Sequence, residues 1–115
     1  MRNKIVGSLK EDIAAKYMLD NGFEILEQNY KCKIGEIDII AKKNNIIRFV
    51  EVKYRKNKAY GGANYAISQK KLQKIYNVAN FYIMTNNIQN NFFSFDAVMI
   101  NGEEIQYIDN IYQNM

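Results

Sequence analysis

Residues 35–55 constrain the fold of this 115-residue chain more than any other segment. They read GEIDIIAKKNNIIRFVEVKYR, which is two apolar, β-branched runs joined by a polar stretch. Such runs on either side of a short polar turn are typical of an antiparallel hairpin. The sequence therefore predicts strands over 35–43 and 46–54, with the turn centred between Asn44 and Asn45.

The register of this hairpin follows from its turn. With Lys43 opposite Ile46, Asp38 pairs with Glu51 and Glu36 pairs with Lys53. Because successive strand residues point to opposite faces, these four charged side chains are expected together on one face. The expected core face carries Ile37, Ile39, Ala41, Val50 and Val52.

The opposed carboxylates Asp38 and Glu51 have two interpretations. Like charges opposite each other destabilise a hairpin by up to about 1 kcal/mol. A bridging divalent cation would turn this repulsion into coordination, and Lys53 beside it could hold a water or a phosphate oxygen, as metal-dependent phosphodiester hydrolysis requires. Alternatively, the face is solvated and Glu36–Lys53 is a weak surface ion pair. The pattern alone supports both equally, because short charged motifs arise by chance.

The rest of the chain predicts two helices and three more strands. The helices are expected over 8–21, with Ser8 as N-cap, and over 68–84. The further strands are expected over 23–32, 92–100 and 104–108, with a turn at Asn101-Gly102 and a loop over 56–66. The order α-β-β-β-α-β-β predicts a single α/β domain over 1–115, a mixed sheet flanked by helices.

Composition limits the chemistry and the location. The chain has no histidine and one cysteine, Cys32, which excludes an intrachain disulfide and histidine-based catalysis. A metal would need oxygen ligands, as Mg²⁺, Mn²⁺ and Ca²⁺ do. The net charge of +4 and the pI near 9.1 suit a polyanionic partner. No apolar run approaches the ~20 residues of a membrane span, and the charged start MRNKIVGSLKED is unlike a signal peptide. A cytoplasmic protein without a membrane partner is expected.

The two hairpin motifs also carry a resemblance. GEIDIIA at 35–41 and FVEVKYR at 49–55 resemble the YraN-like family of bacterial proteins. That family is similar to Holliday junction resolvases and to the wider PD-(D/E)xK nuclease superfamily, whose fold is restriction-endonuclease-like. The resemblance covers nearly the whole chain. Its other motifs are Gly7 to Glu11, NYKC at 29–32, Lys71 in the second helix and Phe95-Asp96.

The resemblance implies roles for four residues. Asp38 and Glu51 would be ligands of Mg²⁺ or Mn²⁺, Lys53 would be the catalytic lysine, and Glu11 would complete the site. Ile37 stands where the superfamily name has proline, a common departure. The resemblance assigns no role to Glu36, although it belongs to the motif, and none to Asp96.

Glu11 has a rival interpretation. It shares a helical stripe with Ala14, Ala15 and Met18, and a glutamate on an apolar stripe is costly to bury without a partner. Ser8-Leu9-Lys10-Glu11 is also a possible capping box, in which Glu11 bonds the Ser8 amide. The residues alone favour the cap, whereas the resemblance favours the site.

The predicted function is a metal-dependent nuclease acting on DNA, with branched or recombination intermediates as candidate substrates. Lys53, Arg55, Lys56 and Lys71 are expected to contact the nucleic-acid backbone. The alternatives are a non-catalytic nucleic-acid-binding module of the same fold and a protein-interaction domain. Junction resolvases usually work as symmetric dimers, so a homodimer is a further expectation by analogy.

Overall fold

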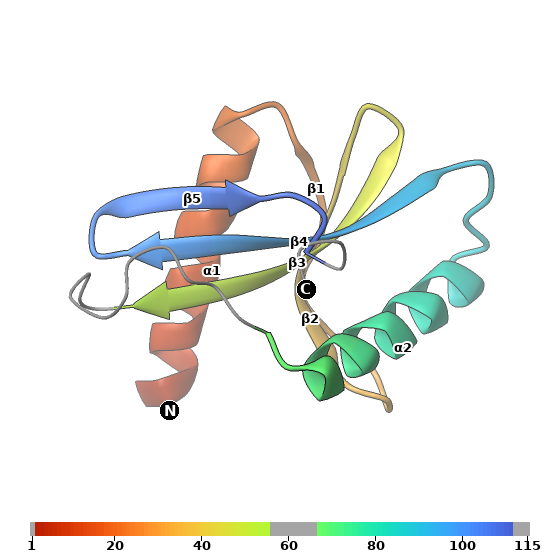
Figure 1. Ribbon diagram of the computed structural model, residues 1–115, viewed down its shortest axis with the longest axis horizontal. Helices are drawn as coiled ribbons and strands as arrows, with labels where there is room; N and C mark the ends of the chain where they lie inside the picture. The colour runs from red at the N-terminus through yellow and green to blue at the C-terminus, as the bar shows by residue number, and fades with distance from the viewer. Residues whose placement is uncertain (1, 56–66, 112–115) are drawn as a thin grey trace.

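The chain folds in the predicted order of helices and strands (Figure 1). The computed structural model describes residues 2–55 and 67–111. The elements are α1 (Arg2–Asp20), β1 (Glu24–Lys31), β2 (Glu36–Lys43), β3 (Ile46–Arg55), α2 (Gln69–Thr85), β4 (Phe92–Asn101) and β5 (Glu104–Ile108). The predicted fold class, a mixed sheet flanked by helices, is confirmed.

The five strands form one sheet in the order β1-β2-β3-β4-β5. Among the five strands of the described residues, only β3 and β4 run parallel, and α2 lies in the connection between them. The register of the first hairpin is confirmed from Lys43–Ile46 to Ile39–Val50. Its turn residues, Asn44 and Asn45, have positive φ angles of 54° and 64°, which match the twist of the flanking strands.

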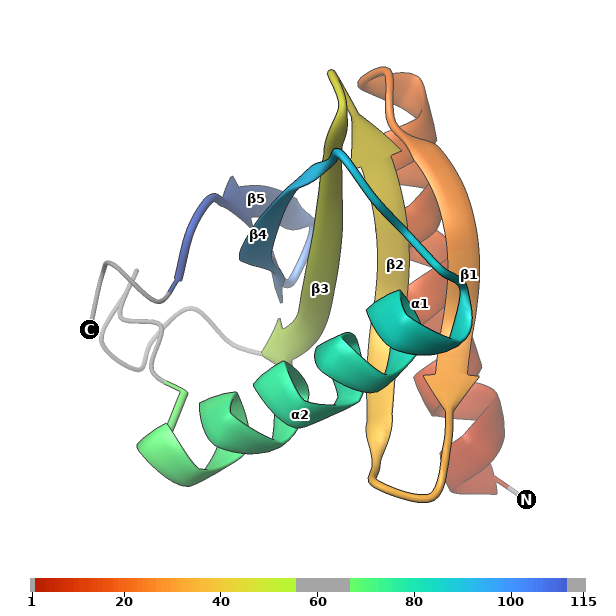
Figure 2. The same cartoon turned by 90° about the vertical axis from the view of Figure 1, so that its right-hand side faces the viewer.

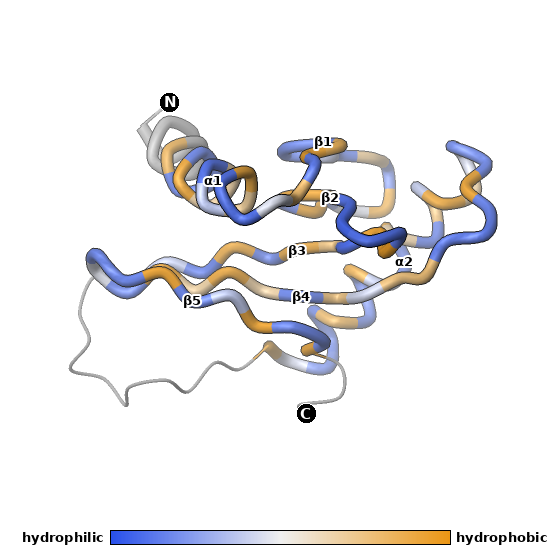
Figure 3. Tube along the Cα trace, turned by 90° about the horizontal axis from the view of Figure 1, so that it is seen from above, coloured by the Kyte–Doolittle hydropathy of each residue, from blue (hydrophilic) through white to orange (hydrophobic). Residues whose placement is uncertain are grey.

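The two helices cover opposite faces of the sheet (Figure 2). Ile39 and Val50 pack in the cluster with Met18 of α1, whereas Ile40 and Phe49 pack in the cluster with α2. Seen from above, α1 and α2 lie on opposite sides of the sheet (Figure 3). Helix α2 buries one side, as an amphipathic helix on a sheet does. The expectation of one polar hairpin face is therefore wrong over most of the hairpin, because both faces are buried.

Strand β2 also breaks the expected alternation at Asp38. Ile37 packs in the cluster under α2, although Ile39, two residues later, packs under α1. The face expected for Ile37 is therefore wrong. Opposite this point, Asn29 of β1 takes a positive φ of 61°, so the irregularity involves both strands. Asp38 consequently lies at a local change in the course of β2.

Several predicted boundaries also shift. Helix α1 begins at Arg2, so Ser8 lies inside it and is not its N-cap. The second hairpin turns through Gly102 and Glu103, because Asn101 still pairs with Glu104. Lys56 and the predicted loop over 56–66 lie outside the described residues. Within 2–55 and 67–111, no helix combines the length and apolar character that crossing a membrane requires.

Candidate functional site

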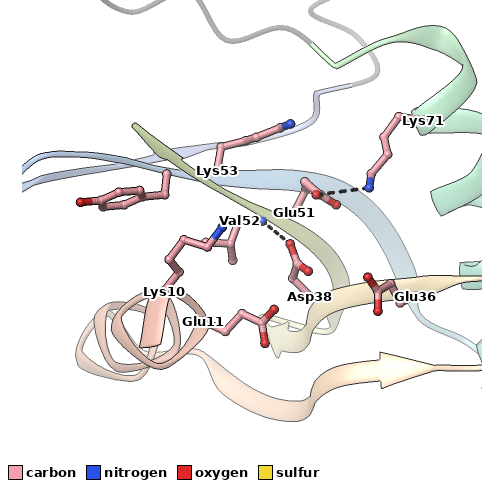
Figure 4. A pocket seen from close by; sticks show the side chains of 9 residues that line it. Lys10, Glu11, Glu36, Asp38, Glu51, Val52, Lys53 and Lys71 are labelled. Carbon is pink, nitrogen blue, oxygen red and sulfur yellow. Dashed lines mark hydrogen bonds and ion pairs between the residues drawn. The ribbon is translucent and has the colours of Figure 1, made fainter. Parts of the chain in front are cut away.

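An open cavity of about 420 Å³ lies beside Asp38, where β2 and β3 separate (Figure 4). Its lining comes from both helices and both strands. The lining residues are Lys10, Glu11, Glu36, Asp38, Glu51, Val52, Lys53, Tyr54 and Lys71. We call this set the acidic cavity.

The side chain of Asp38 explains why the strands separate here. The regular pairing of β2 with β3 extends to Ile39 and Val50. Beyond this pair, the Val52 amide of β3 donates to Asp38 Oδ2 of β2 at 2.8 Å. The Asp38 carboxylate thus replaces a strand carbonyl as the acceptor for the Val52 amide. This bond holds Asp38 between the two strands and uses only one of its two carboxylate oxygens.

Glu11 reaches the cavity from the buried side of α1. Ala14 and Met18, on the same stripe, are fully buried, and Glu11 itself is 8 % exposed. Its Oε1 atom is buried and has no hydrogen-bond partner. Burial first, and then the negative charge of Asp38, raises the pKa of Glu11 to about 7. The capping interpretation is wrong, because Ser8 is inside α1.

Glu51 lies across the cavity from Glu11. Burial and the nearby Asp38 charge raise the pKa of Glu51 to about 7, although Lys71 and Lys53 act in the opposite direction. Burial also raises the pKa of Asp38, against the lowering effects of the Val52 amide and Lys71. The three carboxylates therefore resist being ionised together, as closely spaced buried acids do.

The donor chemistry of the cavity suits a hard cation. Glu11, Asp38 and Glu51 offer only carboxylate oxygens, which Mg²⁺ and Mn²⁺ prefer. Among the side chains that the structure describes, no three acidic groups are already arranged as a set of metal ligands. Glu51 points toward Lys71, away from Glu11 (Figure 4). Coordination by all three would require the Glu51 side chain to turn.

Of the four basic residues expected at the site, two line the cavity. Lys53 and Lys71 line the cavity, and Lys71 Nζ lies 3.7 Å from Glu51 Oε1. Arg55, at the end of β3, is not part of the lining, and Lys56 is outside the described residues. Glu36 lines the cavity with an exposed side chain.

Three lining residues, Lys10, Val52 and Tyr54, were not among the predicted site residues, although Val52 was expected in the core. Tyr54 follows Val52 by two positions, so strand alternation places both on the α1 side of the sheet. That signal could have found Tyr54. Nothing in the pattern distinguishes Lys10 from other surface lysines.

Comparison with known proteins assigns the family. A model described as "Uncharacterised protein family UPF0102" matches residues 10–100. The chain belongs to the UPF0102 family. It is 50% identical over 99 residues to a UPF0102 protein of Clostridium botulinum (strain Loch Maree / Type A3), covering 85% of this chain and 80% of that one. It is 41% identical over 113 residues to a UPF0102 protein of Lachnoclostridium phytofermentans, covering 97% and 96%. The resemblance to the YraN-like family is thereby confirmed.

This UPF0102 member holds another buried carboxylate, Asp96, in a different setting. Asp96 is fully buried in β4. It accepts hydrogen bonds from the side chains of Arg48, Ser94 and Tyr107 and from the Asn110 amide. We call these five residues the Asp96 cluster. Asp96, to which the resemblance assigned no role, thus joins β3, β4, β5 and the segment after β5.

The UPF0102 match spans every residue that lines the acidic cavity. It also spans Arg48, Ser94 and Asp96, whereas Tyr107 and Asn110 lie beyond it. The family assignment therefore covers the whole acidic cavity but only part of the Asp96 cluster.

Proposed function

We propose that this UPF0102 protein is a nuclease that hydrolyses phosphodiester bonds of DNA with Mg²⁺ or Mn²⁺. The observation that carries the proposal is the convergence of Glu11, Asp38 and Glu51, from three different elements, in one cavity open to solvent. A buried carboxylate oxygen without a partner, as in Glu11, is costly for folding. A bound cation would remove that cost.

The proposed roles follow from the side chains present. Glu11, Asp38 and Glu51 would hold the cation. A bound Mg²⁺ or Mn²⁺ supplies an activated water and stabilises charge on the phosphate. Lys53 lines the same cavity, so its ammonium can neutralise a phosphate oxygen of the substrate. Asp38 is oriented by the Val52 amide.

The substrate proposal is narrower and rests on the resemblance to junction resolvases. Branched or recombination intermediates of DNA are the proposed substrates, and a homodimer is the proposed assembly. The basic side chains of Lys53 and Lys71, which line the cavity from β3 and α2, support a polyanionic substrate.

A cleavage panel tests the proposal. Labelled duplex DNA, single-stranded DNA, a four-way DNA junction and RNA are incubated with Mg²⁺ or Mn²⁺. Wild type and the control Glu24→Gln, an exposed residue of β1, should cleave DNA, and Glu51→Gln should not. Failure of wild type to cleave any member with either metal would refute the catalytic proposal.

A non-catalytic nucleic-acid-binding module is the second candidate. The observation that favours it is the Lys71–Glu51 ion pair, which leaves no ready-made set of three ligands in the described part of the chain. Binding without cleavage, with an affinity that falls as salt rises, would support this candidate, because phosphate contacts release counterions. Absence of such binding would leave the protein-interaction alternative.

A further inference from the structure

Lys71 reaches the acidic cavity from α2, on the side opposite Glu11 (Figure 4). Its Nζ lies 3.7 Å from Glu51 Oε1, and the Glu51 side chain is only 10 % exposed. The Lys71 side chain is 45 % exposed, so it approaches Glu51 from the solvent side. The ammonium can therefore leave Glu51 without being buried elsewhere.

The position of Lys71 in α2 is unfavourable for the helix. Ser68 is the N-cap, and its hydroxyl accepts the Lys71 amide at 3.1 Å. Lys71 therefore occupies the third helical position, where a capping box has Glu or Gln. A cation in the first turn also opposes the helix dipole. Helix stability gives no reason for lysine here, whereas the contact with Glu51 does.

The same ammonium is a competitor for any cation that Glu51 would bind. The Lys71 ammonium lies 3.7 Å from Glu51 Oε1 and lines the same cavity as Asp38. Its positive charge therefore attracts both carboxylates while repelling a second cation from them. The two effects follow from one position and one charge.

We propose that Lys71 is an internal counter-ion that competes with the divalent cation for Glu51 and passes to a phosphate of the nucleic acid when the cation binds. This inference rests on the proposed function, because it needs Glu51 as a ligand. It goes further, because it implies that the metal and the nucleic acid each raise the affinity of the protein for the other. A phosphate draws the Lys71 ammonium away from Glu51 and so favours the cation there, while the cation frees the ammonium for the phosphate. Such coupling is reciprocal.

Titration of the protein with Mn²⁺ tests the competition directly. Lys71→Gln removes the charge but keeps a side chain suited to the third helical position. Removing a unit positive charge beside the cation site should tighten the Mn²⁺ dissociation constant on the order of tenfold. The matched control is Lys70→Gln, the neighbouring exposed lysine, which should change it less than twofold.

A second measurement tests the coupling. In a Lys53→Ala background, where no cleavage is expected, Mn²⁺ should raise the affinity for labelled duplex DNA several-fold. Adding Lys71→Gln should remove most of that increase. Fluorescence anisotropy at fixed ionic strength gives both values.

The outcomes separate the two proposals. If wild type binds Mn²⁺ and Glu51→Gln does not, but Lys71→Gln has the wild-type affinity, the counter-ion inference fails and the proposed function stands. Equal tightening by Lys70→Gln would also overturn the inference, since the effect would be one of net charge. If neither the wild type nor any of the variants binds Mn²⁺, both proposals fail.

Discussion

The Asp96 cluster and the acidic cavity both contain buried carboxylates, but they differ in the hydrogen bonds and counter-charges that those carboxylates receive. Asp96 is fully buried and accepts hydrogen bonds from three side chains and one backbone amide, with Arg48 as its counter-charge. Glu11 is nearly as buried, yet its Oε1 accepts no hydrogen bond. Its strongest electrostatic neighbour is another carboxylate, Asp38.

This difference means that the contacts of Asp96 stabilise the fold, whereas fold stability gives no reason for the burial of Glu11. A buried charge is tolerated when a counter-charge and hydrogen bonds replace water. Asp96 has both. Glu11 and Glu51 have their pKa raised to about 7, which means that the folded protein disfavours their ionised form. The acidic cavity therefore carries a stability cost that a ligand could relieve, and the Asp96 cluster does not.

The largest effect is expected at the Asp96 cluster. Asp96→Ala leaves Arg48, whose side chain is 13 % exposed, without its buried partner. Breaking a buried pair in this way should lower the free energy of unfolding by about 3–5 kcal/mol. Urea denaturation followed by circular dichroism measures this loss.

The matched control uses the other partner of Arg48. Asp109 accepts a 2.9 Å bond from Arg48 Nη1 but is 71 % exposed, so Asp109→Asn should cost at most about 1 kcal/mol. Equal losses in Asp96→Ala and Asp109→Asn would show that the buried contacts of Asp96 stabilise the fold no more than the exposed ion pair does.

The next effect belongs to the acidic cavity and requires a cation. Mg²⁺ or Mn²⁺ at a hundred times its dissociation constant should stabilise the native protein by about 2.7 kcal/mol. Asp38→Asn should abolish the accompanying rise in melting temperature. The variant without metal should be no less stable than wild type, because one of three repelling charges is gone. Differential scanning fluorimetry provides the test, and a full metal-induced shift in Asp38→Asn would remove the basis for a metal site.

Sequence reasoning succeeded where the pattern was local. The turn at Asn44-Asn45 predicted the hairpin register, which is correct from Ile39 to Val50. The stripe of Glu11, Ala14, Ala15 and Met18 is indeed the buried face of α1. Both depend on short-range periodicity, which strand and helix geometry dictate.

The failures have a common cause in long-range packing. The apolar residues Ile40 and Phe49 lie on the hairpin face that was expected to be polar, because α2 covers it. Helix α2, which buries this face, begins about 20 residues after Phe49 in the chain, so no local pattern indicates the burial. Apart from Ser94, two residues away in β4, the partners of Asp96 likewise come from β3, β5 and the segment after β5. No local pattern could therefore reveal the whole cluster.

A smaller effect should appear as a dependence of stability on pH. A glutamate in an unfolded chain has a pKa of about 4.5, whereas folding raises the pKa of Glu11 and Glu51 to about 7. Between these values the folded protein holds protons that the unfolded chain has released. The free energy of unfolding should therefore fall as pH rises from about 4.5 through 7, by about 2 kcal/mol after allowance for solvent in the open cavity.

Urea midpoints at pH 5 and pH 8 measure this fall. Glu11→Gln should reduce it, whereas the exposed control Glu24→Gln should leave it at the wild-type value. Saturating Mg²⁺ should also reduce it, because the cation stabilises the ionised carboxylates. A wild type that becomes more stable between pH 5 and pH 8 would show that folding does not raise the pKa of Glu11 and Glu51.

The smallest effect compares one tyrosine from each region. The Tyr107 hydroxyl donates to Asp96 Oδ2, and burial and the Asp96 charge raise the pKa of Tyr107 above its ordinary value. Tyr107→Phe removes one donor but leaves Asp96 bonded to Arg48, Ser94 and the Asn110 amide. The loss should therefore be about 1 kcal/mol, the net worth of one hydrogen bond. Tyr54→Phe, in the exposed lining of the acidic cavity, should change the free energy of unfolding by less than half as much. If Tyr54→Phe costs as much as Tyr107→Phe, the hydroxyl of Tyr107 contributes no more than a solvent-facing one, and the Asp96 cluster is held chiefly by its charge pair.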